Sequence, residues 1–217
     1  MKKHIKKRLL ILSLFSSMLM AEGITKVKIT KDIPYIYTND SGKKVKIERI
    51  QDTNNRLTDD YTKTSRPCPP FCIQPTKIDP DIKNIAELEL ISFMQNEIKN
   101  KTAVIIDARL KRWYELETIP SAINIPFPIM QNASKKKAQK IFQLLGMTVK
   151  KDGSWDFSNA KTLIVFCNGI WCGQSKHFIN GILKYNYPKE KLFYYRSGFQ
   201  GWKLLGLTTV VHKEIKD

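Results

Sequence analysis

A short apolar run that ends directly in a cysteine constrains the fold of this chain more than any other feature. Residues 163–166 are all apolar, and Cys167 follows them at once. Such a run is typical of a strand buried on both faces, as in the parallel sheet of an α/β protein. Sheets of this class carry their functional groups at the carboxyl ends of the strands. The sequence therefore predicts that Cys167 lies at this edge of a sheet.

The residues after Cys167 predict a short loop followed by a helix. Glycines stand at 169 and 173, and apolar residues then recur at helical spacing, at Phe178, Ile179, Ile182 and Leu183. A helix N-terminus presents free backbone N–H groups and the positive end of the helix dipole. We therefore expect a thiolate, persulfide or oxyanion at Cys167 to be stabilised there.

Helices and strands are expected to alternate from residue 83 onward. Periodicity predicts helices at 85–98 with Asn84 as a cap, 134–145, 174–185 and 199–205, and strands at 102–106, 162–166 and 191–195. Upstream, alternation over 27–50 around a turn at 39–42 predicts a β-hairpin, and a turn-rich segment follows at 52–80. The expected fold class is α/β (83–217), preceded by a β-rich extension (22–82) that contains Cys68 and Cys72.

The amino terminus predicts export. Residues 1–8 contain five basic side chains, residues 9–20 are almost wholly apolar, and the small Ala21 follows, which is typical of a secretory signal peptide over 1–21. We expect the protein to be periplasmic or otherwise exported. Because Leu19 rather than a small residue stands two positions before Ala21, an uncleaved anchor remains an alternative.

The mature chain is expected to be strongly basic. Five of the 37 basic residues and none of the 20 acidic ones lie in the signal, which leaves a net charge of +12. The lysines are spread along the chain instead of forming a nucleic-acid motif with aromatic residues, so nucleic acid is not an expected partner. This charge either forms a solvated surface or attracts small anions, acidic proteins or lipid head groups. Membrane contact is expected only through the signal or this surface.

Four segments match, in order and approximate spacing, the motifs of a known family. They are VIIDAR at 104–109, IPSAINIP at 119–126, LIVFC at 163–167 and YRSGFQGW at 195–202. Together they resemble the rhodanese-like sulfurtransferases over residues 84–210. The resemblance implies a parallel five-stranded sheet with helices on both faces. It also implies a nucleophilic cysteine, Cys167, that carries sulfur as a persulfide and needs no metal or cofactor.

The mechanism that this resemblance implies begins with attack of the Cys167 thiolate on the outer sulfur of a small sulfur-containing anion such as thiosulfate. A thiol acceptor or a redox partner protein then removes the sulfur. The expected substrate-binding loop comprises Asn168, Gly169, Ile170, Trp171, Gly173, Gln174 and Ser175. Asp107 and Arg109 are expected to form a supporting ion pair, with substrate contact as the alternative. Trp171 is expected either to line the pocket or simply to pack.

The loop also departs from the family pattern. It is about two residues longer than in many active members, it lacks their arginine, and it contains a second thiol, Cys172. Cys172 is expected to attack a Cys167 persulfide or mixed disulfide and leave a Cys167–Cys172 disulfide. Two alternatives follow, a thiol–disulfide oxidoreductase that uses this pair and a non-catalytic binding module on the same fold. Without an arginine, phosphatase activity is not expected.

Four cysteines allow three full pairings. The local scheme, Cys68–Cys72 with Cys167–Cys172, is the most natural. The first pair is expected either to clip a loose segment or to act as a relay dithiol beside the loop, and zinc binding is the weakest alternative. His177 is expected to face solvent rather than to lower the pKa of a thiol.

Overall fold

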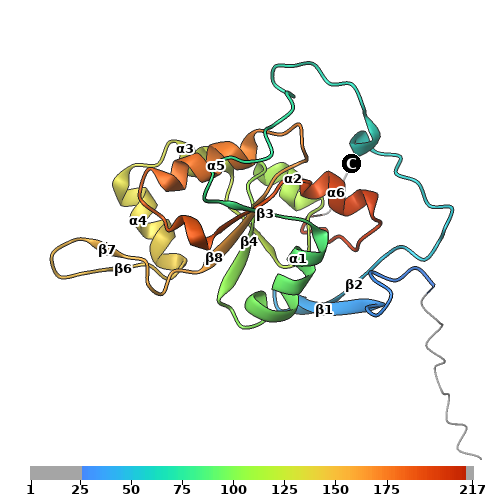
Figure 1. The fold of residues 1–217 in the computed structure, drawn as a ribbon, viewed down its shortest axis with the longest axis horizontal. Coiled ribbons are helices and arrows are strands. Elements are labelled where there is room, and N and C mark those ends of the chain that lie inside the picture. The colour runs from blue at the N-terminus through green and yellow to red at the C-terminus, as the bar shows by residue number, and fades with distance from the viewer. Residues whose placement is uncertain (1–25, 214–217) are drawn as a thin grey trace, which may run out of the picture.

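The computed structural model describes residues 26–213, so the expected signal peptide lies outside the described residues. A five-stranded sheet with strand order β3-β9-β8-β4-β5 forms the centre of the molecule, and all its pairings are parallel (Figure 1). Its strands are β3 (Lys83–Ile85), β4 (Ala103–Asp107), β5 (Ala122–Asn124), β8 (Thr162–Phe166) and β9 (Leu192–Tyr195). The predicted α/β fold with a parallel five-stranded sheet is confirmed.

Helices cover both faces of this sheet. They are α1 (Glu87–Phe93), α2 (Lys111–Leu116), α3 (Phe127–Gln131), α4 (Lys135–Leu144), α5 (Gln174–Leu183) and α6 (Gly198–Leu204). Successive side chains of a strand point to opposite faces, which divides the core in two. On one face, Leu163 and Val165 of β8 share a cluster with residues of α4 and α5. On the other, Ile164 and Phe166 share a cluster with residues of α1 and α6.

The first predicted helix, 85–98, is wrong at its beginning but ends at Ile98 as predicted. Asn84 does not cap it but pairs with Tyr194 inside β3, an edge strand too short to give a sequence pattern. The helix begins at Glu87, where the Glu89 carboxylate accepts the backbone N–H of Ala86 at 2.9 Å. Its last predicted turns form a separate π-helical segment, η2 (Met94–Ile98).

The predicted hairpin is present as β1 (Tyr35–Asp40) and β2 (Lys43–Glu48), an antiparallel pair. Ser41 and Gly42 form its turn with φ angles of 50° and 87°, the left-handed conformation that tight hairpins need. The alternation at 27–29 does not form a strand. Ile36 and Ile47 are buried in the same cluster as Ile164 and Phe166, so the extension packs against the sheet.

Smaller elements complete the described chain. They are a second hairpin, β6 (Thr148–Val149) with β7 (Trp155–Asp156), and two 3-10 turns, η1 (Asp60–Thr62) and η3 (Lys189–Lys191). Within residues 26–213, no helix combines the length and the apolar character that crossing a membrane requires.

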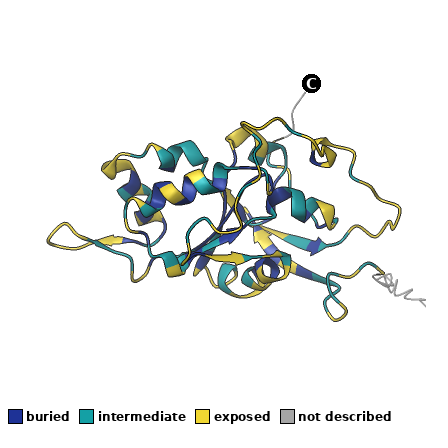
Figure 2. Ribbon diagram, turned by 45° about the horizontal axis from the view of Figure 1, so that its top comes forward, coloured by how far each residue is buried: buried dark blue, intermediate teal, exposed yellow. Residues whose placement is uncertain are grey.

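Residues 59–76, here called the covering segment, lie in the connection between the hairpin and the sheet. On its way to β3 this segment contacts the loop between β8 and α5. Figure 1 shows the chain between β2 and β3 arching around α6 before it enters the sheet. Its Gln74 backbone N–H donates to the carbonyl of Ile170 in that loop at 2.8 Å. Most of the segment is exposed (Figure 2), but Tyr61 is buried in the core. A segment distant in sequence thus lies over the carboxyl edge of β8.

Candidate active site

The thiol loop, residues 167–173, starts where β8 ends. The first backbone N–H groups of α6 hold it in place: Phe199 donates to the Cys167 carbonyl and Gln200 to the Asn168 carbonyl, both at 2.8 Å. This contact requires the glycine at the start of α6. Gly198 has a φ of +60°, and a Cβ there would lie 2.4 Å from the Cys167 carbonyl oxygen. The YRSGFQGW segment therefore positions the beginning of the loop.

Two free thiols lie together inside the loop. Cys167 is 2% exposed and Cys172 is 5% exposed. The Cys167 sulfur lies 3.1 Å from the Cys172 carbonyl oxygen and within hydrogen-bond reach of the Cys172 sulfur. The Cys172 N–H donates to the Gly169 carbonyl at 2.9 Å, which folds the loop back on itself. The Cys167–Cys172 disulfide of the local pairing scheme is therefore not formed in this structure.

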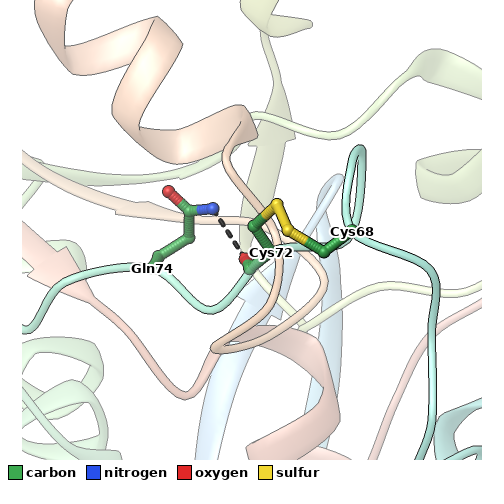
Figure 3. The surroundings of a disulfide bond; sticks show 3 residues. All are labelled: Cys68, Cys72 and Gln74. Atoms are coloured by element: carbon green, nitrogen blue, oxygen red, sulfur yellow. Dashed lines mark hydrogen bonds between the residues drawn. A yellow bond between two sulfur atoms is a disulfide. The ribbon is translucent and has the colours of Figure 1, made fainter.

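The other disulfide of that scheme is formed. Cys68 and Cys72 are joined, with their Cα atoms 4.6 Å apart. Figure 3 shows the disulfide next to Gln74, whose side-chain amide donates to the Cys72 carbonyl at 2.8 Å. Because both sulfurs are bonded to each other, neither is available as a zinc ligand. Among residues 26–213, no three His, Cys, Asp or Glu side chains gather closely enough to hold a metal ion.

The surroundings of the two thiols favour the thiolate at Cys172. A hydrogen bond from Cys167, together with the backbone N–H groups of Gln174 and Asn168, lowers the pKa of Cys172 to about 7. Burial raises the pKa of Cys167, and the neighbouring Cys172 sulfur raises it further. The first backbone N–H of α5, that of Gln174, thus acts on Cys172, and the next, that of Ser175, acts on the thiol at the end of β8. Of the two sulfurs, Cys172 is the more acidic.

A chain of polar side chains ends at the Cys172 sulfur. Arg109 donates to the Tyr61 hydroxyl at 3.0 Å, and this hydroxyl donates to the Asn168 side-chain oxygen at 2.9 Å. The Asn168 amide nitrogen in turn lies 3.7 Å from the Cys172 sulfur. Tyr61 thereby fixes the orientation of the Asn168 amide, with its N–H side toward the sulfur. A buried residue of the covering segment thus supports the thiolate.

The expected ion pair between Asp107 and Arg109 is present at the end of β4. Both side chains are fully buried, and the shortest of their contacts, from Arg109 Nη2 to Asp107 Oδ2, is 2.6 Å. Thr118 donates to the same carboxylate at 2.8 Å, and Arg109 also donates to the Glu117 carbonyl at 2.7 Å. Because these contacts occupy the charged groups, the pair organises the edge of the sheet and is closed to a substrate in this state.

Trp171 packs between the loop and the covering segment. Its ring lies edge-on to Phe71 with 5.6 Å between centroids, and the Arg66 guanidinium carbon lies 4.2 Å from its ring centroid. Its Nε1–H donates to Gln200 at 2.9 Å. The packing role expected for Trp171 is therefore present, and the residue joins three separate parts of the chain.

The remaining predicted loop residues are divided between the inside and the outside of the site. The Ser175 hydroxyl is buried against the Cys167 sulfur and has no hydrogen-bond partner among the described residues. Gln174 also has a buried side-chain oxygen without a partner there. Ile170 is exposed, and Gly173 lies against the Gln74 side chain. His177 is exposed on α5, as expected.

The sequence reasoning missed four residues that contact the loop: Tyr61, Arg66, Gln74 and Gln200. The first three belong to the covering segment, about 100 positions before the loop, where no local periodicity signals a contact. Gln200 lies within the recognised YRSGFQGW motif. That motif was the only available signal, and it identified the segment but not the role of this side chain.

Comparisons with known proteins agree with this architecture. A family model described as the Rhodanese-like domain matches residues 92–205. No curated protein matches the chain. Among solved structures, a thiosulfate sulfurtransferase from Pseudomonas aeruginosa is 19% identical, with a TM-score of 0.41. The alignment covers 61% of this chain but only 21% of that one.

Two further solved structures are similar at the same level. A full-length protein from Lactobacillus plantarum is 18% identical, with a TM-score of 0.42 and coverage of 59% of this chain and 87% of that one. An As-Sb reductase from Leishmania major is also 18% identical, with a TM-score of 0.40 and coverage of 58% and 79%. Since the family model spans more than half of the sequence, this chain belongs to the rhodanese-like domain family.

Proposed function

We propose that this protein is an exported sulfurtransferase or persulfide carrier. Cys167 takes a sulfane sulfur from a small anion such as thiosulfate and passes it to a thiol acceptor. The observation that carries the proposal is the free, buried thiol at the end of β8, which lies 3.1 Å from the Cys172 carbonyl oxygen in a loop that holds a second free thiol; the pKa of that second thiol is lowered to about 7. Near neutral pH this arrangement places a thiolate base beside the nucleophile.

The first step is activation of Cys167. As a donor approaches, the Cys172 thiolate accepts the Cys167 proton through their existing contact. The Cys167 sulfur attacks the outer sulfur of thiosulfate, the S–S bond of the donor breaks, and sulfite leaves with the bonding electron pair. A persulfide remains on Cys167. Burial, which disfavours a free Cys167 thiolate, then limits the access of water and of unspecific oxidants to the product.

The persulfide needs donors for its terminal sulfur, and Ser175 offers them. Its N–H and hydroxyl both lie against Cys167 and favour negative charge there. The hydroxyl has no competing partner among the described residues, so it is available to a new anion. An acceptor thiolate that attacks the terminal sulfur receives it and releases Cys167. Attack by Cys172 on the inner sulfur instead releases hydrosulfide and leaves a Cys167–Cys172 disulfide.

The closed geometry also implies that the site must open. Cys167 is 2% exposed, so a donor reaches it only after the groups around it move. Arg66 lies at the outer side of the loop, and its Nε–H is buried without a hydrogen-bond partner among residues 26–213. We assign to Arg66 the anion-binding role for which the loop itself provides no arginine.

A thiol–disulfide oxidoreductase is the second candidate. One observation favours it: two free thiols lie in one loop, and the segment that holds a formed disulfide contacts this loop through Gln74 and Ile170. This function requires both Cys167 and Cys172, and it predicts oxidation of the pair without uptake of sulfur.

Intact-mass spectrometry distinguishes the two functions. The reduced protein is incubated with thiosulfate, and Cys167→Ser and Cys172→Ser are compared with the wild type. A sulfurtransferase gains one sulfur, about 32 Da, which is absent in Cys167→Ser; in Cys172→Ser it forms more slowly, because the base is missing, but persists, because the resolving thiol is missing too. If no variant gains sulfur and mild oxidation removes two hydrogens only when both cysteines are present, the sulfurtransferase assignment fails and the oxidoreductase is supported.

A further inference from the structure

We propose that Cys68 and Cys72 form a dithiol relay that returns the Cys167–Cys172 pair to its reduced state, with electrons from an external dithiol reductant. The inference rests on the proposed function at one point: a Cys167–Cys172 disulfide must form when Cys172 displaces hydrosulfide from the persulfide. Nothing in the loop itself can reduce that disulfide, so a thiol donor has to approach it.

The contacts of the covering segment bring Cys72 to Cys172. Cys72 directly follows Phe71, which packs on Trp171, and Cys172 directly follows Trp171. On the other side, Gln74 lies two residues after Cys72. Its side chain lies 3.6 Å from the position of a Cβ on Gly173, the residue after Cys172. The chain around Cys72 therefore contacts the chain around Cys172 both before and after the two cysteines.

The four sulfurs also form a sequence from the surface to the interior. Cys68 is exposed and Cys72 is half-buried, whereas Cys172 is 5% exposed and Cys167 only 2%. A protein reductant can reach the first pair but not the second while the covering segment is closed. Figure 3 shows the disulfide beside Gln74, whose backbone N–H donates to the Ile170 carbonyl of the thiol loop at 2.8 Å. In a relay the electrons pass from an exposed pair of cysteines to a buried pair, and the exposure of the four cysteines decreases in that direction.

Hydrogen bonds anchor the segment on both sides of the disulfide. On one side of it, the Tyr61 carbonyl accepts a hydrogen bond from Gln200 at 2.6 Å, and the Tyr61 hydroxyl donates to Asn168. On the other side, Arg196 donates to the Gln74 carbonyl at 2.8 Å. Since the segment is anchored both before and after the cysteines, a simple clip would add little to its position.

The relay proceeds by two thiol–disulfide exchanges. The Cys72 thiolate attacks the Cys172 sulfur of the Cys167–Cys172 disulfide; a Cys72–Cys172 bond forms, and Cys167 leaves with the electron pair and takes up a proton. The Cys68 thiolate then attacks Cys72, and Cys172 leaves as the thiolate. The loop pair gains two electrons and the covering pair loses two. The resulting state, with a Cys68–Cys72 disulfide and two free loop thiols, is the one observed.

The external dithiol completes the cycle by the same chemistry. One of its thiolates attacks the exposed Cys68 sulfur, and its second thiolate resolves the mixed disulfide. The reductant becomes a disulfide, and Cys68 and Cys72 become thiols.

The geometry is tested by trapping the central intermediate. In the full-length Cys68→Ser/Cys167→Ser protein, Cys72 and Cys172 are the only thiols. The matched control, Cys72→Ser/Cys167→Ser, retains Cys68 and Cys172. After mild oxidation and peptide mapping, the relay predicts that the Cys72–Cys172 cross-link forms at least about tenfold faster than the Cys68–Cys172 cross-link. Equal rates, or no Cys72–Cys172 cross-link in protein with wild-type circular dichroism, would overturn the relay.

Turnover provides a test with all loop cysteines present. Sulfide release from thiosulfate is followed with thioredoxin as the dithiol probe. The relay predicts repeated turnover by the wild type. In Cys68→Ser/Cys72→Ser it predicts a burst of one sulfide per chain and then a rate lower by about tenfold or more. A variant that turns over at the wild-type rate contradicts the relay. If neither protein forms a persulfide, the proposed function fails, and the cross-linking result decides the relay independently.

Discussion

The neighbouring strands β8 and β4 end side by side at the same edge of the sheet, yet the polar groups at their two ends differ in how far they are paired. β4 ends in Asp107, whose carboxylate meets Arg109 and Thr118 in a fully buried network. β8 ends in a pair of free thiols, beside a serine hydroxyl that lacks a partner among the described residues. At the first end the polar groups are occupied by one another. At the second, two sulfurs and a donor remain available for a new bond.

At one edge of the sheet, the end of β4 therefore has a structural role, whereas the end of β8 holds the groups that are available for chemistry. Burying a charge is costly unless it is paired, so the end of β4 tolerates little change. A neutral thiol is far less polar, and Cys167, whose pKa is raised by burial, is buried at low cost without a full set of partners. The end of β8 therefore retains unpaired groups without losing the fold. The two ends are linked by hydrogen bonds from Arg109 to Tyr61 and from Tyr61 to Asn168. Through these bonds the ordered network at the end of β4 also positions the Asn168 side chain at the end of β8.

The largest expected effect is the loss of one partner at the end of β4. Arg109→Met leaves Asp107 buried without its cation, and we expect a loss of about 3–5 kcal/mol in the free energy of unfolding. Cys172→Ala, at the end of β8, is expected to cost only about 1 kcal/mol. Urea denaturation measures both values. If the two variants lost equal stability, the contrast between the strand ends would be wrong.

Removing the Cys68–Cys72 disulfide is expected to have the next largest effect. The bond closes a short loop, and the chain-entropy model gives at most about 2 kcal/mol for it. We therefore expect Cys68→Ser/Cys72→Ser to stay folded, with a modest decrease in the urea midpoint. Unfolding of this variant at room temperature would show that the covering segment depends on its disulfide and not on its hydrogen bonds.

The polar chain that links the two ends predicts a shift in pH dependence. The pKa of Cys172 is lowered to about 7, and its deprotonated form is the base, so the rate of persulfide formation should rise with pH through about 7. Asn168→Ala removes a donor that favours the thiolate, which moves this profile to higher pH. At pH 6 we expect a decrease of about threefold and at pH 9 almost none.

Tyr61→Phe is the matched variant for this shift, because it keeps the Asn168 side chain but removes the hydroxyl that orients it. Its pH profile should move in the same direction by a smaller amount. Single-turnover rates from pH 5 to 10 measure both profiles. A uniform decrease at every pH would assign Asn168 a purely structural role.

The smallest expected effect concerns the selectivity for the donor. Arg66→Gln should slow persulfide formation from thiosulfate about fivefold, because a charge-assisted contact to the anion is lost. The rate with an uncharged organic trisulfide should not change. Lys44→Gln is the control, since Lys44 lies over Tyr37 in the hairpin and away from the loop. Equal slowing with both donors would exclude anion binding by Arg66.

Much of the sheet could be predicted because its central strands carry strong local signals. Residues 162–166 form β8 as predicted, and α4 begins after Ser134, whose hydroxyl accepts the Lys137 N–H at 3.3 Å. The edge strand β3 was missed, because three residues with mixed polarity give no period. β3 is stabilised by its pairing with β9 and not by a pattern in its own sequence.

The site was predictable in its residues but not in its electrostatics. The position of Cys167 follows from the apolar run before it, and Cys172 follows from the sequence of the loop. The lowered pKa of Cys172 depends on the hydrogen bond from Cys167, on the N–H of Gln174 and on the Asn168 amide. The orientation of that amide depends on Tyr61, 107 positions away in the sequence. Contacts of this range leave no local pattern.

The central claim is that Cys167 receives the sulfur although Cys172 is the more acidic thiol. The most direct test is to locate the sulfane sulfur in the wild-type protein. After brief reaction with thiosulfate and alkylation of all thiols and persulfides, fragmentation of the peptide that spans residues 162–176 assigns the added sulfur to one cysteine. The account predicts that it lies on Cys167. Sulfur found on Cys172 would contradict it and make Cys172 the nucleophile.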